Sequence, residues 1–150
     1  MRGAKMNLRE SKFEEFLKSS NLTCFEKEEV KDELETVVYR SFIEVEGQNL
    51  PMVIVMDNSI YTNIRVQIAS KVIKDTNKEA VLSYINELNR EYKVFKYYVT
   101  EEADVCLDSC ITSLAEEFNP EMVYTILNVI LEHIMEHYST FMKKIWSGEK

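Results

Sequence analysis

Glycine and proline are scarce in this chain, which has three glycines and two prolines among 150 residues. Gly3, Gly47 and Gly148 lie far apart, and none of them opens a predicted helix. Phosphate-binding loops of the P-loop or dinucleotide type need clustered glycines before a helix. The sequence therefore excludes both kinds of loop, and its composition predicts a folded, globular chain of one domain.

Long apolar runs and an excess of basic residues are also missing. No apolar stretch approaches the roughly 18 residues that span a bilayer, and the N-terminal MRGAKMN lacks the apolar core of a signal peptide. The formal net charge of −8 repels phosphate backbones. We therefore expect a cytoplasmic protein with no membrane and no nucleic-acid partner. Met6 is an alternative start, so whether residues 1–5 are native stays open.

The three cysteines form an odd set, which argues against a disulfide framework and predicts reduced thiols. On a shared strand, Cys106 and Cys110 would lie about 13 Å apart, too far for a disulfide or a metal pair. Asp104 and Asp108 lie beside them and would raise the pKa of either thiol. A cysteine nucleophile is therefore not expected.

Periodicity predicts eight elements in the order α-β-β-β-α-β-β-α. Helical spacing predicts helices over residues 8–19, 76–91 and 119–146, and alternation predicts strands over residues 37–46, 50–56, 60–69, 93–100 and 105–111. The charged segment 21–35 has no assignment. Strands grouped in hairpins with three helices predict an α+β fold, in which one antiparallel five-stranded sheet carries its helices on one face.

Capping residues mark the three predicted helix starts. Ser11 with Glu14 and Thr76 with Glu79 each fit the capping-box pattern. Asn119 can cap the last helix because Pro120 follows it at the first helical position.

The sheet face without helices is predicted to carry more apolar and aromatic surface than solvation needs. Its predicted residues are Arg40, Phe42, Glu44, Val53, Val55, Tyr61, Asn63, Arg65, Lys96 and Tyr98. Either these side chains support one another across strands, or they form a contact surface for a second subunit or a peptide.

The apolar surface of the last helix is wider than the stripe that is needed to cover one sheet. Its extra apolar residues are Met122, Val129, Met135, Met142 and Trp146. Methionine adapts to irregular partners, so part of this margin is a candidate subunit or client interface. Alternatively, the first helix and the segment from Leu22 to Leu34 cover it.

His133, Glu136 and His137 match the H-x-x-E-H pattern of inverted zinc peptidases, in which two histidines bind zinc and the glutamate activates water. Catalysis also needs a third ligand, and the chain has no other histidine. On a helical wheel both histidines lie at the edge of the apolar stripe. We interpret them as boundary side chains that rest on neighbours and keep one nitrogen in water, with zinc as the alternative.

Two short segments resemble the YbjN family, whose fold is that of bacterial type III secretion chaperones. They are the helix end Tyr84-Ile85-Asn86-Glu87-Leu88-Asn89 and the stretch from Phe95 to Tyr98 that leads to Val105-Cys106-Leu107. Together with the element order, the resemblance covers about residues 36–146, and the segment 21–35 departs from it. It implies a small acidic cytoplasmic protein, often a homodimer, that binds another polypeptide without catalysis.

The sequence thus predicts a non-enzymatic, chaperone-like or regulatory protein-binding module that acts as a homodimer and has no cofactor. The client stays unidentified. The alternatives are a zinc-dependent hydrolase built on His133, Glu136 and His137, and a small-ligand sensor with a pocket between the sheet and the long helix. The predicted partner or dimer surface consists of Phe42, Val53, Val55, Tyr61, Arg65, Tyr98, Met135, Met142 and Trp146.

Overall fold

The computed structural model describes residues 7–146, so the question about residues 1–5 lies outside the described residues. The elements are α1 (Leu8–Ser19), β1 (Glu26–Glu29), β2 (Val37–Val45), β3 (Gln48–Met56), β4 (Tyr61–Ala69), α2 (Lys78–Glu91), β5 (Lys96–Val99), β6 (Val105–Thr112), the 3-10 turn η2 (Ala115–Glu117) and α3 (Pro120–Trp146). In residues 7–146, no helix is both long and apolar enough to cross a membrane.

The strands form one antiparallel sheet in the order β1-β2-β3-β4-β6-β5. The α+β class is confirmed, and the prediction of five strands is wrong because Glu26–Glu29 adds a sixth strand beside β2. All four residues of β1 are exposed and charged. A strand without apolar alternation gives no periodic signal, which explains why segment 21–35 had no assignment.

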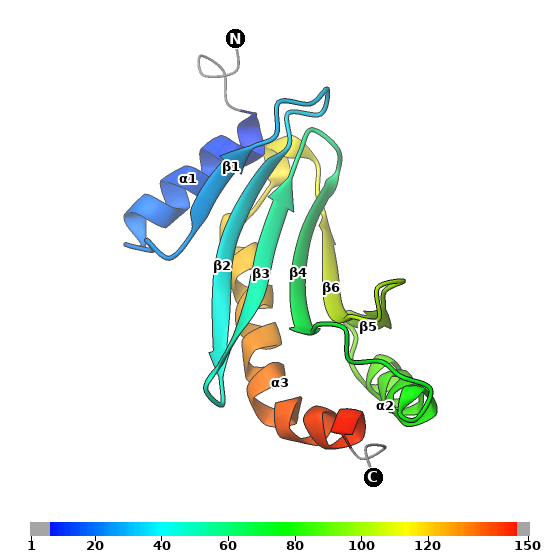
Figure 1. The fold of residues 1–150 in the computed structure, drawn as a ribbon. Coiled ribbons are helices and arrows are strands. Elements are labelled where there is room, and N and C mark those ends of the chain that lie inside the picture. The colour runs from blue at the N-terminus through cyan, green and yellow to red at the C-terminus, as the bar shows by residue number, and fades with distance from the viewer. Residues whose placement is uncertain (1–6, 147–150) are drawn as a thin grey trace.

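One face of the sheet builds the core with the helices. Alternate residues of β2, β3, β4 and β6 are buried there, and α3 supplies Val123, Leu127, Ile130 and Ile134 to the same cluster. In Figure 1, α3 runs behind the sheet, α1 lies near β1, and α2 lies beside β5. We call the opposite face, which faces the viewer, the open face.

The helix starts differ in part from the predicted caps. The first helix spans the predicted residues, but its cap is Asn7, whose Oδ1 accepts a hydrogen bond from the Glu10 amide at 2.7 Å. The second helix begins after Asn77, whose side chain caps nothing. Instead Asn77 Nδ2 donates to the Val72 and Ile145 carbonyls at 2.8 Å each and ties α2 to α3. The cap at Asn119 is confirmed, because its Oδ1 accepts from the Glu121 amide at 3.0 Å.

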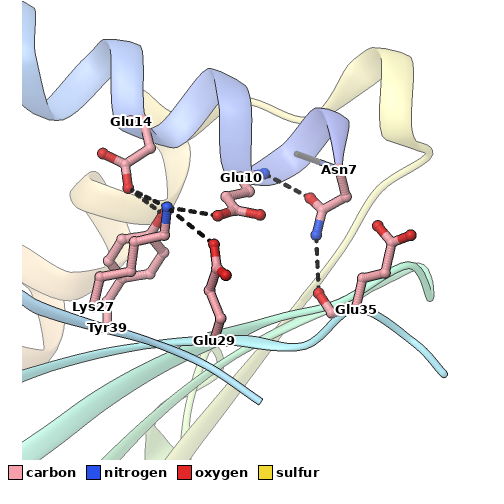
Figure 2. A network of polar contacts seen from close by, with 7 residues as sticks. All are labelled: Asn7, Glu10, Glu14, Lys27, Glu29, Glu35 and Tyr39. Atoms are coloured by element: carbon pink, nitrogen blue, oxygen red, sulfur yellow. Dashed lines mark hydrogen bonds and ion pairs between the residues drawn. The ribbon is translucent and has the colours of Figure 1, made fainter. Parts of the chain in front are cut away.

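A partly buried polar network joins α1 to the sheet (Figure 2). The Glu10 side chain is fully buried, and Lys27 Nζ lies 2.6 Å from Glu10 Oε2 and 3.0 Å from Glu14 Oε1. Tyr39 also donates its hydroxyl to Glu14, at 3.1 Å. Burial alone would lower the pKa of Lys27, but its hydrogen bonds to Glu10 and Glu14 outweigh burial and raise that pKa above its usual value. Lys27 therefore stays charged and holds α1 against β1.

A second set of polar contacts fixes the opposite side of α1. The Arg9 side chain is buried and donates from Nη2 to the Ser113 carbonyl at 2.6 Å and from Nη1 to the Asp57 carbonyl at 3.5 Å. Lys12 Nζ donates to the Glu116 carbonyl at 2.7 Å. Because these carbonyls follow β3 and β6, α1 is tied to one end of the sheet by its charged residues.

Candidate functional site

The strands β3 and β4 pair over only part of their length. Their ladder runs from Met52 opposite Val66 to Met56 opposite Thr62. The first residues of β3, 48–51, pair with β2, and the last residues of β4 pair with β6. Figure 1 shows β3 and β4 diverging toward the β2–β3 hairpin, with α3 behind the gap. Each strand therefore has an edge here that no described strand covers.

The cause of the divergence on β3 is Pro51. The hairpin turn Glu46-Gly47 has φ values of 47° and 78°, which fit a two-residue type I′ turn. The residues that flank such a turn form a hydrogen-bonded pair, so Asn49 and Pro51, at alternate positions, direct their backbone polar groups toward β4. Proline has no N–H to donate. The ladder can therefore not continue past Met52 in the regular pattern.

On β4, a β-bulge has the same effect. The register between β4 and β6 shifts between Gln67 and Ala69. A bulge bends the strand that carries it and increases its local twist. The bend begins one residue after Val66, where the ladder with β3 stops.

The space between the diverging strands is a cleft of about 580 Å³. Its lining residues are Glu46, Gln48, Asn49, Leu50, Pro51, Gln67, Ile68, Ala69, Ser70, Tyr138, Met142 and Trp146. Leu50, Ile68 and Tyr138 are buried and make its inner part apolar. Among the described lining residues, Glu46 is the only charged one. The cleft thus combines apolar side chains with strand edges that can form hydrogen bonds.

Trp146 is half exposed in this cleft and is the only tryptophan of the chain. Lys74 Nζ lies 5.9 Å from the centre of the indole ring, a cation–π distance. One turn earlier on α3, Met142 is partly buried against the core. Burial and, next, the charge of Glu46 raise the pKa of Tyr138, so its hydroxyl stays protonated. Met142 and Trp146, both predicted partner residues, therefore lie together in the cleft.

The sheet residues predicted as a partner surface are spread along the open face. Val53 pairs with Arg65, and Val55 pairs with Asn63. Phe42 and Tyr61 are 66% and 48% exposed. The structure thus separates the predicted surface into the open face, with Phe42, Val53, Val55, Tyr61, Arg65 and Tyr98, and the cleft.

A paired charge group lies on the open face over β4, β6 and the edge strand β5. Arg65 donates from Nε and Nη2 to the two Asp108 oxygens at 2.9 Å each, and Tyr98 donates to the same carboxylate at 3.3 Å. Hydrogen bonding to Asp108 raises the pKa of Arg65. Burial and the charge of Asp108 raise the pKa of Tyr98 to about 12. These partners satisfy the charges, so the group fits a contact surface better than a catalytic site.

Met135 belongs to neither surface. It is 52% exposed and does not line the cleft. Because it precedes Met142 by seven residues, it lies on the same side of α3, two turns away from the cleft.

The two histidines lie on the side of α3 that faces α2 and β5. His133 is 5% exposed, and its Nε2 lies 2.8 Å from the Tyr97 hydroxyl. His137 Nε2 and Nδ1 lie 2.9 Å and 3.4 Å from the Tyr92 and Tyr84 hydroxyls. The interpretation of two boundary histidines is therefore wrong for His133, which is covered by Tyr92 and Phe95 between α2 and β5 and by Tyr97 of β5. Burial and then His137 lower the pKa of His133 to about 4.

Tyrosine contacts also use most of the nitrogens that a zinc ion would need. Three of the four imidazole nitrogens face tyrosine hydroxyls, and the fourth, Nδ1 of His133, is buried without a hydrogen-bond partner. Within residues 7–146, no three His, Cys, Asp or Glu residues are placed to hold a metal ion. The described geometry does not support the zinc alternative.

The three thiols are unpaired in the structure. Burial and, next, the charge of Asp108 raise the pKa of Cys106 and that of Cys110. A raised pKa disfavours the nucleophilic thiolate. This agrees with the expectation that neither cysteine is a nucleophile.

The strand walls of the cleft were not predicted from the sequence. A proline within an otherwise apolar strand was the available signal, because proline within a sheet marks an edge or an irregularity. The bulge in β4 had no comparable signal, since its residues continue the regular alternation.

The sequence matches no protein-family model and no curated protein in the comparisons made. A function therefore has to be inferred from the geometry of the cleft and of the open face.

Proposed function

We propose that this protein is a non-enzymatic protein-binding module, chaperone-like or regulatory, that holds an extended segment of another polypeptide in the cleft between β3, β4 and α3. The supporting observation is the interrupted β3–β4 ladder, which leaves two strand edges beside an apolar floor. An extended segment that adds to a sheet edge gains main-chain hydrogen bonds, and pockets for alternate side chains give selectivity.

The outer edges of the sheet offer less to such a segment. The strand β1 has four residues, of sequence EKEE, and β5 also has four and begins with Lys96. Short, charged edge strands are the usual protection against unwanted strand pairing. Strand addition in the cleft is therefore favoured over addition at either outer edge.

The open face is our proposed dimer surface. The resemblance to the YbjN family implies a cytoplasmic homodimer that binds polypeptides, and the exposed Phe42 and Tyr61 supply apolar area for a second copy. Two clefts, one from each copy, would then remain available to clients.

A small-ligand sensor is the second candidate. The volume of about 580 Å³ lies within the range of small-molecule sites, and the cleft lies between the sheet and α3. A hydrolase with zinc on His133 and His137 is the third, and metal analysis tests it directly. Stoichiometric zinc that is lost in His133→Ala and His137→Ala would favour the hydrolase over our proposal.

Trp146 provides the test, because the only tryptophan of the chain lines the cleft. Heptapeptides are selected from a random library on the immobilised protein, synthesised, and titrated against it while Trp146 fluorescence is recorded. We expect saturable changes with dissociation constants of about 1–100 μM. Met142→Ala should weaken binding, whereas Met135→Ala, outside the cleft, should not.

Absence of any selected peptide that changes Trp146 emission would contradict the proposed function. So would peptides that bind equally well to the protein and to the Met142→Ala variant. A small molecule that co-purifies in the cleft and excludes the peptides would favour the sensor.

A further inference from the structure

The two walls of the cleft differ in how well they can accept a strand. The β4 wall contains the bulge between Gln67 and Ala69, so its backbone groups are irregularly spaced. The β3 wall continues in regular register with β2 from Val45 opposite Gln48 to Phe42 opposite Pro51. A strand that enters the cleft therefore meets a regular edge only on β3.

On that edge, Asn49 is the residue that can exchange two backbone hydrogen bonds with a residue of an incoming strand. The type I′ turn directs the N–H and C=O of Asn49 and the C=O of Pro51 into the cleft. A strand residue opposite Asn49 exchanges two hydrogen bonds with it, and a residue two positions away donates to the Pro51 carbonyl. Alternate residues lie about 6.8 Å apart along a strand, so a peptide in extended conformation matches this spacing.

The charge of the cleft lies at the turn next to this edge. Glu46 precedes Gln48 by two residues and lines the cleft, whereas Gln48, Asn49, Gln67 and Ser70 are uncharged. The influence of Glu46 reaches the inner part of the cleft, since it contributes to the raised pKa of Tyr138 after burial. Lys74, whose Nζ lies 5.9 Å from the centre of the Trp146 ring, is not among the residues that line the cleft. The one charge among the described lining residues is therefore negative, and it lies at the β2–β3 turn.

We propose that the occupant is an extended, basic-apolar peptide segment that pairs with β3 at Asn49, packs an apolar side chain on Met142 and Trp146, and places a lysine or arginine side chain against Glu46. This inference rests on the proposed function and specifies the chemistry of the partner. Side chains on one face of a strand are spaced two residues apart. One segment can therefore place an apolar side chain on Met142 and Trp146 and a basic side chain against Glu46. The open face and the outer strands take no part in it.

The charge contact is tested with the selected heptapeptides, acetylated and amidated so that their termini carry no charge. Each lysine or arginine is replaced in turn by norleucine, and each peptide is titrated against the wild type and Glu46→Gln. We expect one replacement to weaken wild-type binding about threefold to tenfold, as a partly exposed ion pair does. The same replacement should have no effect on Glu46→Gln. Glu33→Gln is the matched control, because Glu33 is exposed in the segment between β1 and β2 and does not line the cleft.

The strand pairing is tested separately by N-methylation of the peptide backbone at each position in turn. Methyl groups should abolish binding at two positions that lie two residues apart, whose amides donate to the Asn49 and Pro51 carbonyls, and leave it nearly unchanged at the position between them. Hydrogen exchange of the Asn49 amide, followed by NMR, should slow on saturation with peptide. Uniform sensitivity to methylation together with an unchanged Asn49 exchange rate would overturn the pairing with β3.

The outcomes separate this inference from the proposed function. Peptides that change Trp146 fluorescence but carry no basic residue, or bind Glu46→Gln as tightly as the wild type, would overturn the charge assignment and leave the protein-binding function standing. Peptides that leave Trp146 unaffected would overturn both.

Discussion

His133 is a titratable side chain enclosed by aromatic rings. The ring centres of Tyr92 and Phe95 each lie 4.5 Å from that of the imidazole, and Tyr97 supplies the hydroxyl at Nε2. Protonation would place a charge in this enclosure next to His137. The folded state therefore favours neutral His133, in agreement with its pKa of about 4.

This enclosure predicts a pH dependence of stability. The pKa of His133 in the folded protein is below its value of about 6.5 in the unfolded chain, so the unfolded chain binds the proton first as the pH falls. The contribution of neutral His133 to the free energy of unfolding is complete above about pH 6.5 and is lost as the pH falls from about 6.5 to about 4. We expect the free energy of unfolding to fall by about 2 kcal/mol from pH 7 to pH 5 on account of this group.

Urea unfolding at pH 7 and pH 5 measures this loss, with His133→Gln as the control. Glutamine does not titrate, so the variant should lose less stability over the same interval. Equal losses in the two proteins would show that His133 does not carry the dependence.

Single-residue predictions succeeded where the neighbours along the chain determine exposure. Alternation placed Phe42, Val53 and Arg65 on the open face, as the strand registers confirm. The helical wheel misplaced His133 because Tyr92, Phe95 and Tyr97, which are distant from it in sequence, cover it. The spacing of apolar residues along one helix gives no information about burial by residues that are distant in sequence.

At the scale of elements, α1 is held to the sheet by charged as well as apolar side chains. Phe13 and Leu17 are its buried apolar residues, and Arg9 and Glu10 are buried beside them. Buried charges need their partners, because an uncompensated charge in the interior is costly. The docking of α1 therefore depends on a few specific contacts.

Lys27→Met is the substitution that tests this dependence. It removes the ammonium 2.6 Å from the fully buried Glu10 carboxylate, and we expect it to lower the free energy of unfolding by about 3 kcal/mol. Glu14→Gln removes a partly exposed partner of the same ammonium and should cost less than about 1 kcal/mol. Chemical denaturation compares the two. Equal losses in the free energy of unfolding for the two variants would show that the burial of Glu10 does not determine the loss.

Pro51→Val tests the cause of the cleft. Valine supplies the missing N–H, so the β3–β4 ladder can extend by one pair toward Gln67. We expect slower hydrogen exchange of the Gln67 backbone amide than in the wild type, protection of the new amide at position 51, and about tenfold weaker binding of cleft peptides. Unchanged binding together with slower exchange would show that the ladder gap is not needed for binding.

Element predictions succeeded for the long, periodic segments. The three helices and five of the strands follow from apolar spacing, and α1 was located over residues 8–19 although its cap was misassigned. Asn7 with Glu10 fits the capping pattern as well as Ser11 with Glu14, so the pattern alone cannot choose between them. The strand β1 stayed hidden because Glu26–Glu29 is exposed throughout and is placed only by pairing with β2.

At the scale of the whole molecule, the open face and the cleft are two separate surfaces. The order of elements predicted the first, since five strands with helices on one side leave the other side uncovered. The cleft depends on a proline and a bulge acting together across two strands. Such a combination emerges only once the register is known.

Phe42→Glu tests the proposed homodimer. Phe42 is 66% exposed, so its replacement should change the stability of one copy by less than about 0.5 kcal/mol while placing a charge in the dimer surface. By light scattering at high micromolar concentration, we expect a dimer for the wild type and a monomer for the variant. Leu114→Glu, 58% exposed but off the sheet, should stay dimeric. A monomeric wild type would contradict the dimer.

The gap in the β3–β4 ladder limits the stoichiometry of strand pairing. An exposed outer edge can accept a strand that then offers a new edge to the next molecule, and growth into fibres follows. A strand that enters an internal gap is flanked by β3 on one side and by β4 on the other, so it offers no edge for further addition. Binding should therefore saturate at one segment per copy, even with a client that aggregates by itself.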